Sequence, residues 1–377
     1  MRKIKILFSF GTRPEAIKLA PVIHELKNNT CFKTRVCVTA QHREMLDQVL
    51  RLFKIRPDHD LNVMVEGQTL YTISQNVLKG MDKVLQDERP DLLMVQGDTT
   101  SAFISALCAF YRKIRVAHVE AGLRTHDKFQ PFPEEVNRRL ISHVADINFA
   151  PTPTAKRFLE QENIPGEIFV TGNTVVDALF KIAPARMRKR KSAKFAEQRT
   201  LLLTVHRREN FGRPLMNVFE AVKEIAAGDS SIKIIYPVHP NPNVRHVAHK
   251  MLESIRNVQL VKPLNYLELV RIMAESHIIL TDSGGIQEEA PAFGIPVLIL
   301  REKTERPEAI IYKTARLIGT DTDRIVSEVQ RLLSSAVEYR KLVAKRNPFG
   351  DGRAAKRIAA VLIREYGFGR PKVRQFQ

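Results

Sequence analysis

Short apolar runs alternate with amphipathic segments along most of the chain. Each run is rich in Val, Ile and Leu, and the segment after it repeats its apolar residues at the helical spacing of three to four positions. Such alternation predicts parallel strands that helices bury on both faces. In the N-terminal half the predicted strands are 3–10, 34–40, 91–97 and 114–119, and the predicted helices between them are 14–27, 43–53 and 99–111.

The same pattern starts again after residue 172. Its predicted strands are 199–205, 233–238, 258–261, 277–281 and 295–300. A length of 377 residues also favours two domains over one. We therefore predict two Rossmann-like α/β domains with parallel sheets, 1–171 and 172–351, joined near TGNTVVDAL. The last helical stretch, about 352–377, is expected to pack back on the first domain.

The chain contains no sign of a membrane segment, because no apolar run approaches the ~18 residues required. The basic and apolar start MRKIKILFSF resembles a signal peptide, but the apolar stretch is short and no small-residue cleavage site follows. Three cysteines without metal-ligand spacing indicate reduced thiols. We expect a cytoplasmic protein with no disulfide and no structural zinc.

The net charge of +19 favours an anionic partner, either nucleic acid or an anionic substrate. Basic residues cluster at 186–194 and after Arg353, without interleaved aromatic residues and without a nucleic-acid-binding motif. A solvated basic face that helps to attract an anionic substrate is the simpler interpretation. We therefore expect no nucleic-acid site and no membrane insertion.

Chemistry-bearing residues follow the predicted strands, where open parallel sheets bind their ligands. In FSFGTRPEAIK, Gly11 permits a tight turn and Pro14 suits the first position of a helix. Arg13 then lies at the helix mouth, where the helix dipole favours an anion. Lys18 is one turn inward on the same face as Pro14. These two cations predict an anion site.

Acidic residues follow two further strands and open one helix. Asp98 comes directly after the third predicted strand, where it could equally cap the helix that follows. Glu120 ends the next strand, and capping explains it less easily. In FPEEVNRR, Glu134 and Glu135 open a helix, where acids are common in any protein. Asp98 and Glu120 are therefore the stronger carboxylate candidates.

The second domain also places polar residues after its strands. His206 follows the first of these strands and is flanked by Arg207 and Arg208 in LTVHRREN, an unusual arrangement at a strand end. His239 follows the next strand inside a turn rich in Pro and Asn, where a purely structural role is equally open. His206 is therefore the preferred candidate of the two.

The segment DSGGIQEEA opens a helix with exposed backbone amides. Ser283, Gly284 and Gly285 offer a hydroxyl and amides to a phosphate. Glu289 is four residues after Gly285 on the same face, and its carboxylate can accept hydrogen bonds from a ribose diol. The chain has neither GxGxxG nor GxxxxGK[ST], which argues against a dinucleotide site and a P-loop. Arg306, in TERPEA, adds a candidate phosphate contact.

Taken together, these motifs resemble those of one family. The chain is similar to the non-hydrolysing UDP-N-acetylglucosamine 2-epimerases over residues 4 to about 365, through GTRPEAIKLAP, VQGDTTSA, HVEAGLRT, PFPEEVNRR, TGNTVVDAL, HRREN, DSGGIQEEAP and TERPEA in this order. The resemblance implies a glycosyltransferase-B type fold with the active site in the interdomain cleft. One stretch departs from the family: PLNYLELV places Leu264 and Leu269 where Gln and Phe often surround the uracil.

The resemblance also implies an activity and residue roles. UDP-GlcNAc would be converted to UDP-ManNAc by elimination of UDP to a 2-acetamidoglucal and re-addition, without a metal or other cofactor. The catalytic residues would be Asp98, Glu120, Glu134 and His206. The substrate-binding residues would be Arg13, Lys18, Ser283, Gly284, Gly285, Glu289 and Arg306. Bacterial members bind a second UDP-GlcNAc as an activator, which suggests Gln41, His42 and Arg208 as allosteric residues, and a homodimer is expected.

Several alternatives remain open from the sequence. Hydrolysing 2-epimerases look like GSRAEYG near the start, where this chain has GTRPEAIK. Epimerases of other UDP-2-acetamido sugars tend toward ARPQ or RPEIIR. A retaining glycosyltransferase of the same fold would need an acceptor site, which a carboxylate-rich cleft fits less well. A basic nucleic-acid-binding protein would bind random DNA in a salt-dependent manner without nucleotide-sugar turnover.

Overall fold

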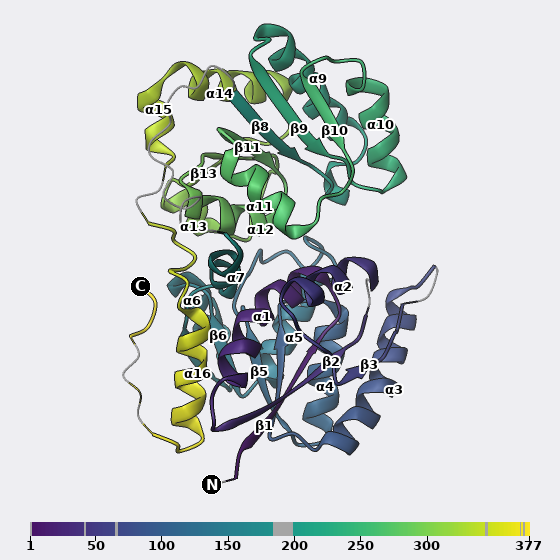
Figure 1. Ribbon diagram of the computed structural model, residues 1–377, viewed down its shortest axis with the longest axis vertical. Helices are drawn as coiled ribbons and strands as arrows, with labels where there is room; N and C mark the ends of the chain where they lie inside the picture. Colours follow the sequence, from purple (N-terminus) through teal and green to yellow (C-terminus); the bar gives the residue numbers. More distant parts are fainter. Residues whose placement is uncertain are drawn as a thin grey trace. The chain divides into compact units, whose positions relative to one another are not determined.

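The computed structural model describes residues 2–40, 43–64, 67–183, 199–343, 346–369, 371 and 374–377. The chain divides into two compact units (Figure 1). The N-terminal unit combines Met1–Ala178 with Phe349–Gln377, and the C-terminal unit is Leu179–Pro348. The boundary therefore falls inside one helix, α7 (Thr174–Ile182). None of the helices in the described part combines the length and the apolarity that crossing a bilayer requires.

The N-terminal unit is built on a parallel sheet, which has seven strands among the described residues, in the order β3-β2-β1-β4-β5-β6-β7. The strands are β1 (Ile4–Phe10), β2 (Phe32–Val38), β3 (His59–Asp60), β4 (Leu92–Gln96), β5 (Arg115–Val119), β6 (Ile147–Ala150) and β7 (Glu167–Val170). Strand order reverses between β1 and β4, which pair in parallel with Phe8 opposite Met94. Such a switch point leaves a crevice at the carboxyl ends of the strands, where α/β proteins bind ligands.

Helices cover this sheet, because each helix buries its apolar face against the strands. They are α1 (Arg13–Lys27), α2 (Arg43–Leu52), α3 (Leu70–Glu88), α4 (Thr100–Tyr111), α5 (Glu134–Val144), α6 (Pro153–Gln161), the first part of α7, and α16 (Ala354–Glu365). In one core cluster, Met81 of α3 and Ile104 of α4 pack with the strand residues Leu7, Val95 and Val116. Full burial of each large aliphatic side chain stabilises the fold by roughly 1.5–3 kcal/mol.

The end of the chain returns to the N-terminal unit. Helix α16 packs against α1 and is drawn in yellow beside the purple α1 in Figure 1. Beyond it, the Phe376 side chain is buried, and its backbone N–H donates to the Val170 carbonyl over 3.1 Å. The last segment is therefore an integral part of the unit that contains β1 to β7.

The C-terminal unit repeats the architecture with a parallel sheet, which has six strands in the described part, ordered β10-β9-β8-β11-β12-β13. The strands are β8 (Arg199–Thr204), β9 (Ile232–Pro237), β10 (Val258–Val261), β11 (Ile278–Thr281), β12 (Val297–Ile299) and β13 (Ala315–Leu317). Its switch point lies between β8 and β11, which pair with Thr204 opposite Thr281. The predicted fold class, two α/β domains with parallel sheets, is confirmed.

The helices of the C-terminal unit pack on this sheet in the same way. They are the last part of α7, then α9 (Arg213–Gly228), α10 (Pro242–Leu252), α11 (Tyr266–Glu275), α12 (Gly284–Glu289), α13 (Pro307–Ile311), α14 (Thr322–Ser334) and α15 (Ala336–Lys341), with short 3₁₀ turns η1 (Arg208–Asn210) and η2 (Ala290–Phe293). Phe219 of α9 lies in the core with Tyr236 of β9, their ring centroids 5.6 Å apart. This packing holds the strand ends in place. The polar residues that follow the strands project from these ends.

Candidate active site

Glu120 lies at the carboxyl ends of the strands of the N-terminal sheet, one strand away from the switch point between β1 and β4. It follows β5, whose last residue, Val119, is in register with Gln96 of β4. The Glu120 backbone adopts a left-handed conformation with a φ of +66°, and only 8% of the residue is exposed. Its Oε1 forms an ion pair with Lys18 Nζ and accepts a hydrogen bond from Asn173 Nδ2 over 3.1 Å, while its Oε2 accepts from Gln96 Nε2. The carboxylate is thus buried and held by donors.

Lys18 reaches Glu120 because the first turn of α1 is fixed by a buried acid. The Glu15 carboxylate accepts from the backbone N–H groups of Gly11 over 3.0 Å and Thr12 over 2.7 Å, and from the Thr99 hydroxyl over 2.8 Å. Burial raises the pKa of Glu15, although these hydrogen bonds oppose the effect. Arg13 stands half-buried at the first position of α1, and Lys18 is buried one turn later. The two predicted cations therefore lie on the same helix at the switch point.

Asp98 follows β4 after Gly97, which has a φ of +72°. The predicted alternative, in which Asp98 caps the next helix, is wrong, because the Thr99 hydroxyl accepts from Ala102 N over 3.1 Å and is the N-cap of α4. The Asp98 side chain instead pairs with Arg138, whose Nη2 donates to Oδ2 over 2.5 Å. The Asp98 carboxylate is therefore held by an arginine of α5 rather than by the first turn of α4.

The helix α5 supplies the arginine that holds Asp98. Arg138 is buried, and its Nη1 also meets Glu135 Oε2 at 3.3 Å. Glu135, buried as well, accepts from the backbone N–H groups of Thr125 and His126 over 3.1 and 3.2 Å. Glu134 opens the same helix and is half-buried beside Glu135. Glu135 therefore holds the backbone at Thr125 and His126, and Arg138 holds the Asp98 carboxylate.

A buried histidine fixes the turn between β4 and Asp98. His118, on β5, is fully buried, and its Nε2 lies 2.7 Å from the Gly97 carbonyl oxygen. Because the carbonyl only accepts, Nε2 carries the hydrogen. Burial lowers the pKa of His118 to about 4, so its ring is neutral at physiological pH. His118 is thus a structural donor rather than a titrating group near neutrality.

In the C-terminal unit, His206 is organised by Asp282, which follows β11. Asp282 is fully buried, and its Oδ2 accepts from the backbone N–H groups of His206 and Arg207 over 2.9 and 2.8 Å and from Asn210 Nδ2 over 3.0 Å. Its Oδ1 lies 3.5 Å from His206 Nδ1. The His206 ring stacks on His239, with centroids 5.3 Å apart and planes 9° apart. The two predicted histidines therefore lie face to face.

The Ser283–Gly285 turn lies beside Arg306. A Cβ added at Gly284 would come within 2.5 Å of the Arg306 Cζ atom, so the guanidinium packs directly on the glycine backbone. A Cβ at Gly285 would meet nothing closer than the Ser283 hydroxyl at 4.0 Å. The space beside Gly285 is therefore open, as a phosphate contact at the start of α12 requires.

Arg306 is held by acids from two segments. Its Nε donates to Glu288 Oε1 over 2.7 Å, and its Nη1 pairs with Glu305. Arg301 also pairs with Glu305, over 2.8 Å. This network fixes the position of the buried guanidinium, which a bidentate contact with an anion requires.

Glu289, predicted to bind a ribose, is buried at the end of α12. The Tyr266 hydroxyl at the start of α11 donates to its Oε1 over 2.5 Å. The sequence had not singled out Tyr266. This contact orients the Glu289 carboxylate. Residues of both α11 and α12 therefore contribute to the candidate site residues of the C-terminal unit.

Part of the predicted site lies outside the described residues. Gln41, His42 and the basic stretch 186–194 belong to segments that the structure does not describe, and the same holds for the side chain of Arg208. Their predicted roles therefore stay predictions. Elsewhere, the described residues contain no group of three His, Cys, Asp or Glu side chains that could hold a metal ion.

Sequence reasoning missed several residues that hold the candidates in place: Gln96, Arg138, Asn173, Asp282 and, as a partner of His206, His239. Position offered a signal for two of them, because Gln96 ends an apolar strand run and Asp282 directly follows one. The direction in which Arg138 points had no such signal.

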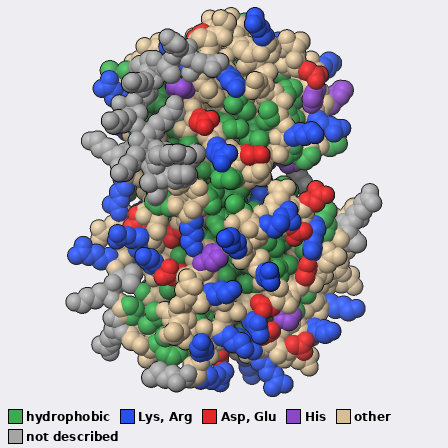
Figure 2. Space-filling view, in the orientation of Figure 1, with side chains coloured by type: hydrophobic (Ala, Val, Ile, Leu, Met, Phe, Trp, Pro, Cys, Tyr) green, Lys and Arg blue, Asp and Glu red, His purple; other side chains and the backbone are tan. Residues whose placement is uncertain are grey.

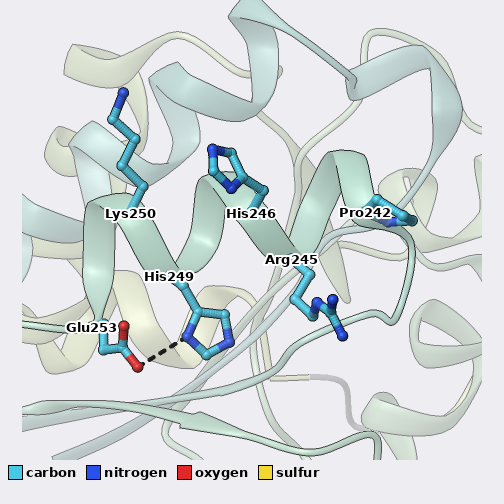
Figure 3. A pocket seen from close by; sticks show the side chains of 6 residues that line it. All are labelled: Pro242, Arg245, His246, His249, Lys250 and Glu253. Carbon is cyan, nitrogen blue, oxygen red and sulfur yellow. Dashed lines mark hydrogen bonds and ion pairs between the residues drawn. The ribbon is translucent and has the colours of Figure 1, made fainter.

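A separate hollow of about 620 Å³ lies on the surface along α10 and is lined by Pro242, Arg245, His246, His249, Lys250 and Glu253 (Figure 3). His249 Nδ1 lies 3.1 Å from Glu253 Oε1. In Figure 3 His246 and Lys250 point to one side of the helix, whereas Arg245 and His249 point to the other. These side chains do not converge on a common point, so the hollow is not a second catalytic constellation.

Comparison with known proteins identifies one family. The family model described as UDP-N-acetylglucosamine 2-epimerase matches residues 24–363. UDP-N-acetylglucosamine 2-epimerase from Salmonella typhimurium is 50% identical over 95% of this chain and 98% of its own length, and that from Bacillus subtilis is 48% identical over 98% and 97%. The crystal structure of UDP-GlcNAc 2-epimerase from Neisseria meningitidis bound to UDP-GlcNAc aligns with a TM-score of 0.90 at 45% identity, over 96% of this chain and all of that one.

Proposed function

This chain belongs to the UDP-N-acetylglucosamine 2-epimerase family, and we propose that it interconverts UDP-GlcNAc and UDP-ManNAc by reversible elimination and re-addition of UDP. One observation carries the proposed chemistry. Asp98 and Glu120, two carboxylates with different donors, follow the ends of the adjacent strands β4 and β5 in the N-terminal sheet. Reversal of configuration at C2 requires proton transfer on both faces of the sugar, and two separately held carboxylates can supply it.

The proposed reaction proceeds without a change in oxidation state. The C2 proton of the sugar is not acidic, so its removal is coupled to the departure of UDP from C1. One carboxylate accepts the C2 proton while the C1–O bond breaks, which yields 2-acetamidoglucal and UDP. The other carboxyl group then delivers a proton to the opposite face of C2 as UDP adds back to C1. Asp98 and Glu120 are the two groups that we assign to these steps, and Glu134 tunes or relays their protons.

We assign retention of UDP to the histidine, the glycine turn and the cations described above. His206, oriented by Asp282, stabilises the developing charge on the departing diphosphate. Ser283, Gly284 and Gly285 offer donors to the phosphates, and Arg306 adds its held guanidinium. Arg13 and Lys18 contribute the remaining positive charge at the mouth of α1, and Glu289 accepts hydrogen bonds from the ribose. Cations placed in this way neutralise a diphosphate without a metal ion.

The proposal also includes partners and location. We propose that a second UDP-GlcNAc acts as an activator through Gln41, His42 and Arg208, that two copies of the chain form a homodimer, and that the enzyme works in the cytoplasm. Family membership supports these assignments. Gel filtration with light scattering tests the dimer, and saturation kinetics test the activator, because activation by substrate gives a sigmoidal rate curve.

Product analysis tests the proposed reaction. Wild-type enzyme is incubated with UDP-GlcNAc, and nucleotides and free sugars are separated by anion-exchange chromatography. We expect a stable mixture of UDP-GlcNAc and UDP-ManNAc with no stoichiometric release of UDP. The variants Asp98→Asn and Glu120→Gln should each lower kcat by at least about 10²–10⁴-fold, the range of a lost acid or base.

Each other outcome assigns the chain differently. Free ManNAc with stoichiometric UDP would show a hydrolysing 2-epimerase. Conversion of a different UDP-2-acetamido sugar, with UDP-GlcNAc left unchanged, would show that the sugar assignment is wrong. No turnover of any UDP-sugar would contradict the proposed activity, and salt-dependent binding to random DNA would then favour the nucleic-acid alternative.

A further inference from the structure

Asn173, in the turn between β7 and α7, directly contacts the predicted catalytic carboxylate Glu120. Its Nδ2 donates to Glu120 Oε1 over 3.1 Å, and only 2% of the residue is exposed. It belongs to TGNTVVDAL, a motif for which neither the sequence nor the proposed reaction gives a chemical role. The contact lies entirely within the N-terminal unit. A buried side chain so close to a proposed acid–base group can decide how that group is held.

The orientation of the Asn173 amide is fixed by its other contacts. Its Oδ1 accepts from Val175 N over 3.0 Å, and its backbone N–H donates to the Phe349 carbonyl over 2.6 Å. If the amide flipped, its NH₂ group would face the Val175 N–H and its oxygen would face the Glu120 carboxylate, so both hydrogen bonds would be lost. The returning chain tightens this turn, since a Cβ at Gly350 would lie 3.2 Å from the Asn173 carbonyl oxygen.

Gln96 holds the other oxygen of Glu120 in the same way. It ends β4, is almost fully buried, and donates through Nε2 to Glu120 Oε2. An amide that donates favours the ionised carboxylate over the neutral acid. Unlike the Lys18 ammonium, which the diphosphate of a bound substrate can also attract, the two amides keep the same charge throughout the reaction. They are therefore the constant part of the environment of Glu120.

We propose that Asn173 and Gln96 are positioning residues that keep Glu120 an oriented, ionised carboxylate in the resting enzyme, ready to accept the C2 proton. The inference rests on the proposed epimerase function. It adds to that function the two amides that keep the Glu120 carboxylate in its ionised, proton-accepting form. In the reaction, Glu120 takes the proton as the C1–O bond breaks and becomes a neutral acid. Because the two amides bind the ionised carboxylate better than the neutral acid, they then favour release of the proton from Glu120.

The other charged groups near Glu120 must be considered as sources of a change in activity with pH. Lys18, from α1, pairs with it directly. His118, on β5, interacts electrostatically with Glu120, Asp98 and Arg124, but burial lowers its pKa to about 4. In the wild type, a change in activity between pH 5 and 8 therefore does not come from His118. This separation makes the pH profile a suitable measurement.

The experiment measures kcat/KM for UDP-GlcNAc from pH 5 to 9 in the wild type, Asn173→Asp and Gln96→Glu. Each variant replaces a donor with a second carboxylate, which disfavours ionisation of Glu120. The acid limb should move upward by at least about one pH unit, and kcat/KM at pH 6 should fall at least about tenfold, with partial recovery toward pH 9. The KM for UDP-GlcNAc should change less than kcat.

Asn257→Asp is the matched control. Asn257 lies in the C-terminal unit, and its Nδ2 donates to the carbonyls of Ala226 and Ile232 over 3.0 and 2.9 Å. The same chemical change there should lower the midpoint of thermal unfolding and leave the acid limb where the wild type has it. Circular dichroism establishes folding of each variant, and Gln96→Glu provides the test if Asn173→Asp does not fold.

The outcomes separate the inference from the proposed function. Wild-type enzyme that does not epimerise UDP-GlcNAc would overturn the proposed function itself. An active wild type, with both folded variants retaining an acid limb within about 0.3 pH unit of it, would overturn the positioning role alone. An upward shift in either folded variant, without a shift in Asn257→Asp, supports the role.

Discussion

The two strand-end carboxylates of the N-terminal unit differ in their surroundings at the scale of single residues. The Asp98 side chain is 25% exposed and pairs with the Arg138 guanidinium, whereas the Glu120 side chain is 5% exposed and meets an ammonium and two amides. Pairs of acids in contrasting environments divide acid and base roles between them. In the proposed reaction, this difference would allow one of the two groups to accept a proton while the other donates one.

A prediction at this scale concerns Gly284. Gly284→Ala places a methyl group within 2.5 Å of Arg306 Cζ, so the guanidinium must leave the glycine backbone and its pairing with Glu288 and Glu305 is disturbed. We expect at least about tenfold weaker UDP binding, measured by isothermal titration calorimetry. A lower midpoint of thermal unfolding should accompany it, because overpacking a buried site costs about 1–3 kcal/mol.

Gly285→Ala separates the two effects. The added methyl group enters open space, with its nearest neighbour at 4.0 Å, so the thermal midpoint should stay near that of the wild type. If the diphosphate lies against this turn, UDP binding should still weaken. Unchanged UDP affinity in both variants would contradict the assignment of the phosphates to the start of α12.

The sequence predicted which polar residues lie at strand ends, but it did not predict the residues that contact them. The apolar runs place Asp98, Glu120 and His206 after strands, and the structure has them there. The partner of Asp98 depends on how α5 packs over the end of the sheet, which no local pattern encodes. The same holds for the stacking of His206 on His239, because it joins turns 33 residues apart.

At the scale of elements, a carboxylate from α7 holds the first turn of the returning helix α16. Asp177 accepts hydrogen bonds from the backbone N–H groups of Ala354 and Ala355 over 3.1 and 2.9 Å, the first turn of α16. The amides at a helix N-terminus lack intrahelical partners, so Asp177 satisfies two of them. Burial nevertheless raises the pKa of Asp177 to about 6.

Asp177→Asn should change the pH dependence of stability. Because the folded-state pKa of about 6 exceeds the ordinary value of 3.8, the folded chain binds more protons than the unfolded chain between these values. The contribution of Asp177 to stability is therefore fully present below about pH 3.8 and is lost as pH rises through 6. The loss is on the order of 3 kcal/mol. The unfolding free energy of the variant minus that of the wild type should rise by this amount from pH 4 to 7 in urea titrations.

Asp351→Asn provides a control of opposite sign. Its side-chain hydrogen bond with Arg357 lowers the pKa of Asp351, so its contribution to stability is present above pH 3.8 and is lost as the pH falls further. Because the Asp351 charge also raises the pKa of Asp177, this variant should show a pH-dependent difference from the wild type between pH 5 and 7 that is much smaller than that of Asp177→Asn. A flat difference for Asp177→Asn over the same range would contradict the assignment of the titration to Asp177.

Element types followed from the sequence, but their neighbours in the sheets did not. Alternation of buried runs and amphipathic segments predicted the strands β1, β2, β4, β5 and β8 to β12, but it did not predict the short strands β3, β6, β7 and β13. Strand order depends on crossover connections, so the adjacency of β1 with β4 and of β8 with β11 became visible only in the structure. The docking of α16 by Asp177 likewise joins residues almost 180 positions apart, which local periodicity cannot reveal.

At the scale of the whole molecule, the net charge of +19 requires an account. In Figure 2, Lys and Arg side chains are spread over the visible surface and interspersed with acidic and apolar ones, rather than gathered in one continuous stripe. Positive charge raises the local concentration of an anionic substrate, and on the face that Figure 2 shows it forms no continuous track for a nucleic-acid backbone. This distribution favours the interpretation of the charge as an aid to substrate capture.

Ionic strength tests this interpretation. Screening shortens the range of the attraction, so kcat/KM for UDP-GlcNAc should fall about three- to tenfold between 20 and 300 mM NaCl, mainly through KM. A neutral osmolyte at the same osmolality controls for changes in water activity. Submicromolar binding to a random DNA duplex at 150 mM NaCl would instead point to nucleic acid as the target of the charge.

Proton NMR of the enzyme with UDP-GlcNAc in heavy water tests the central claim most directly. The claim is that residues of this chain move the C2 proton of a nucleotide sugar without losing UDP. The predicted result is UDP-ManNAc with deuterium at C2, little free UDP, and loss of this exchange in Glu120→Gln. UDP-ManNAc that retains hydrogen at C2 would contradict proton transfer with solvent, and the absence of both conversion and exchange at saturating substrate would contradict the proposed activity.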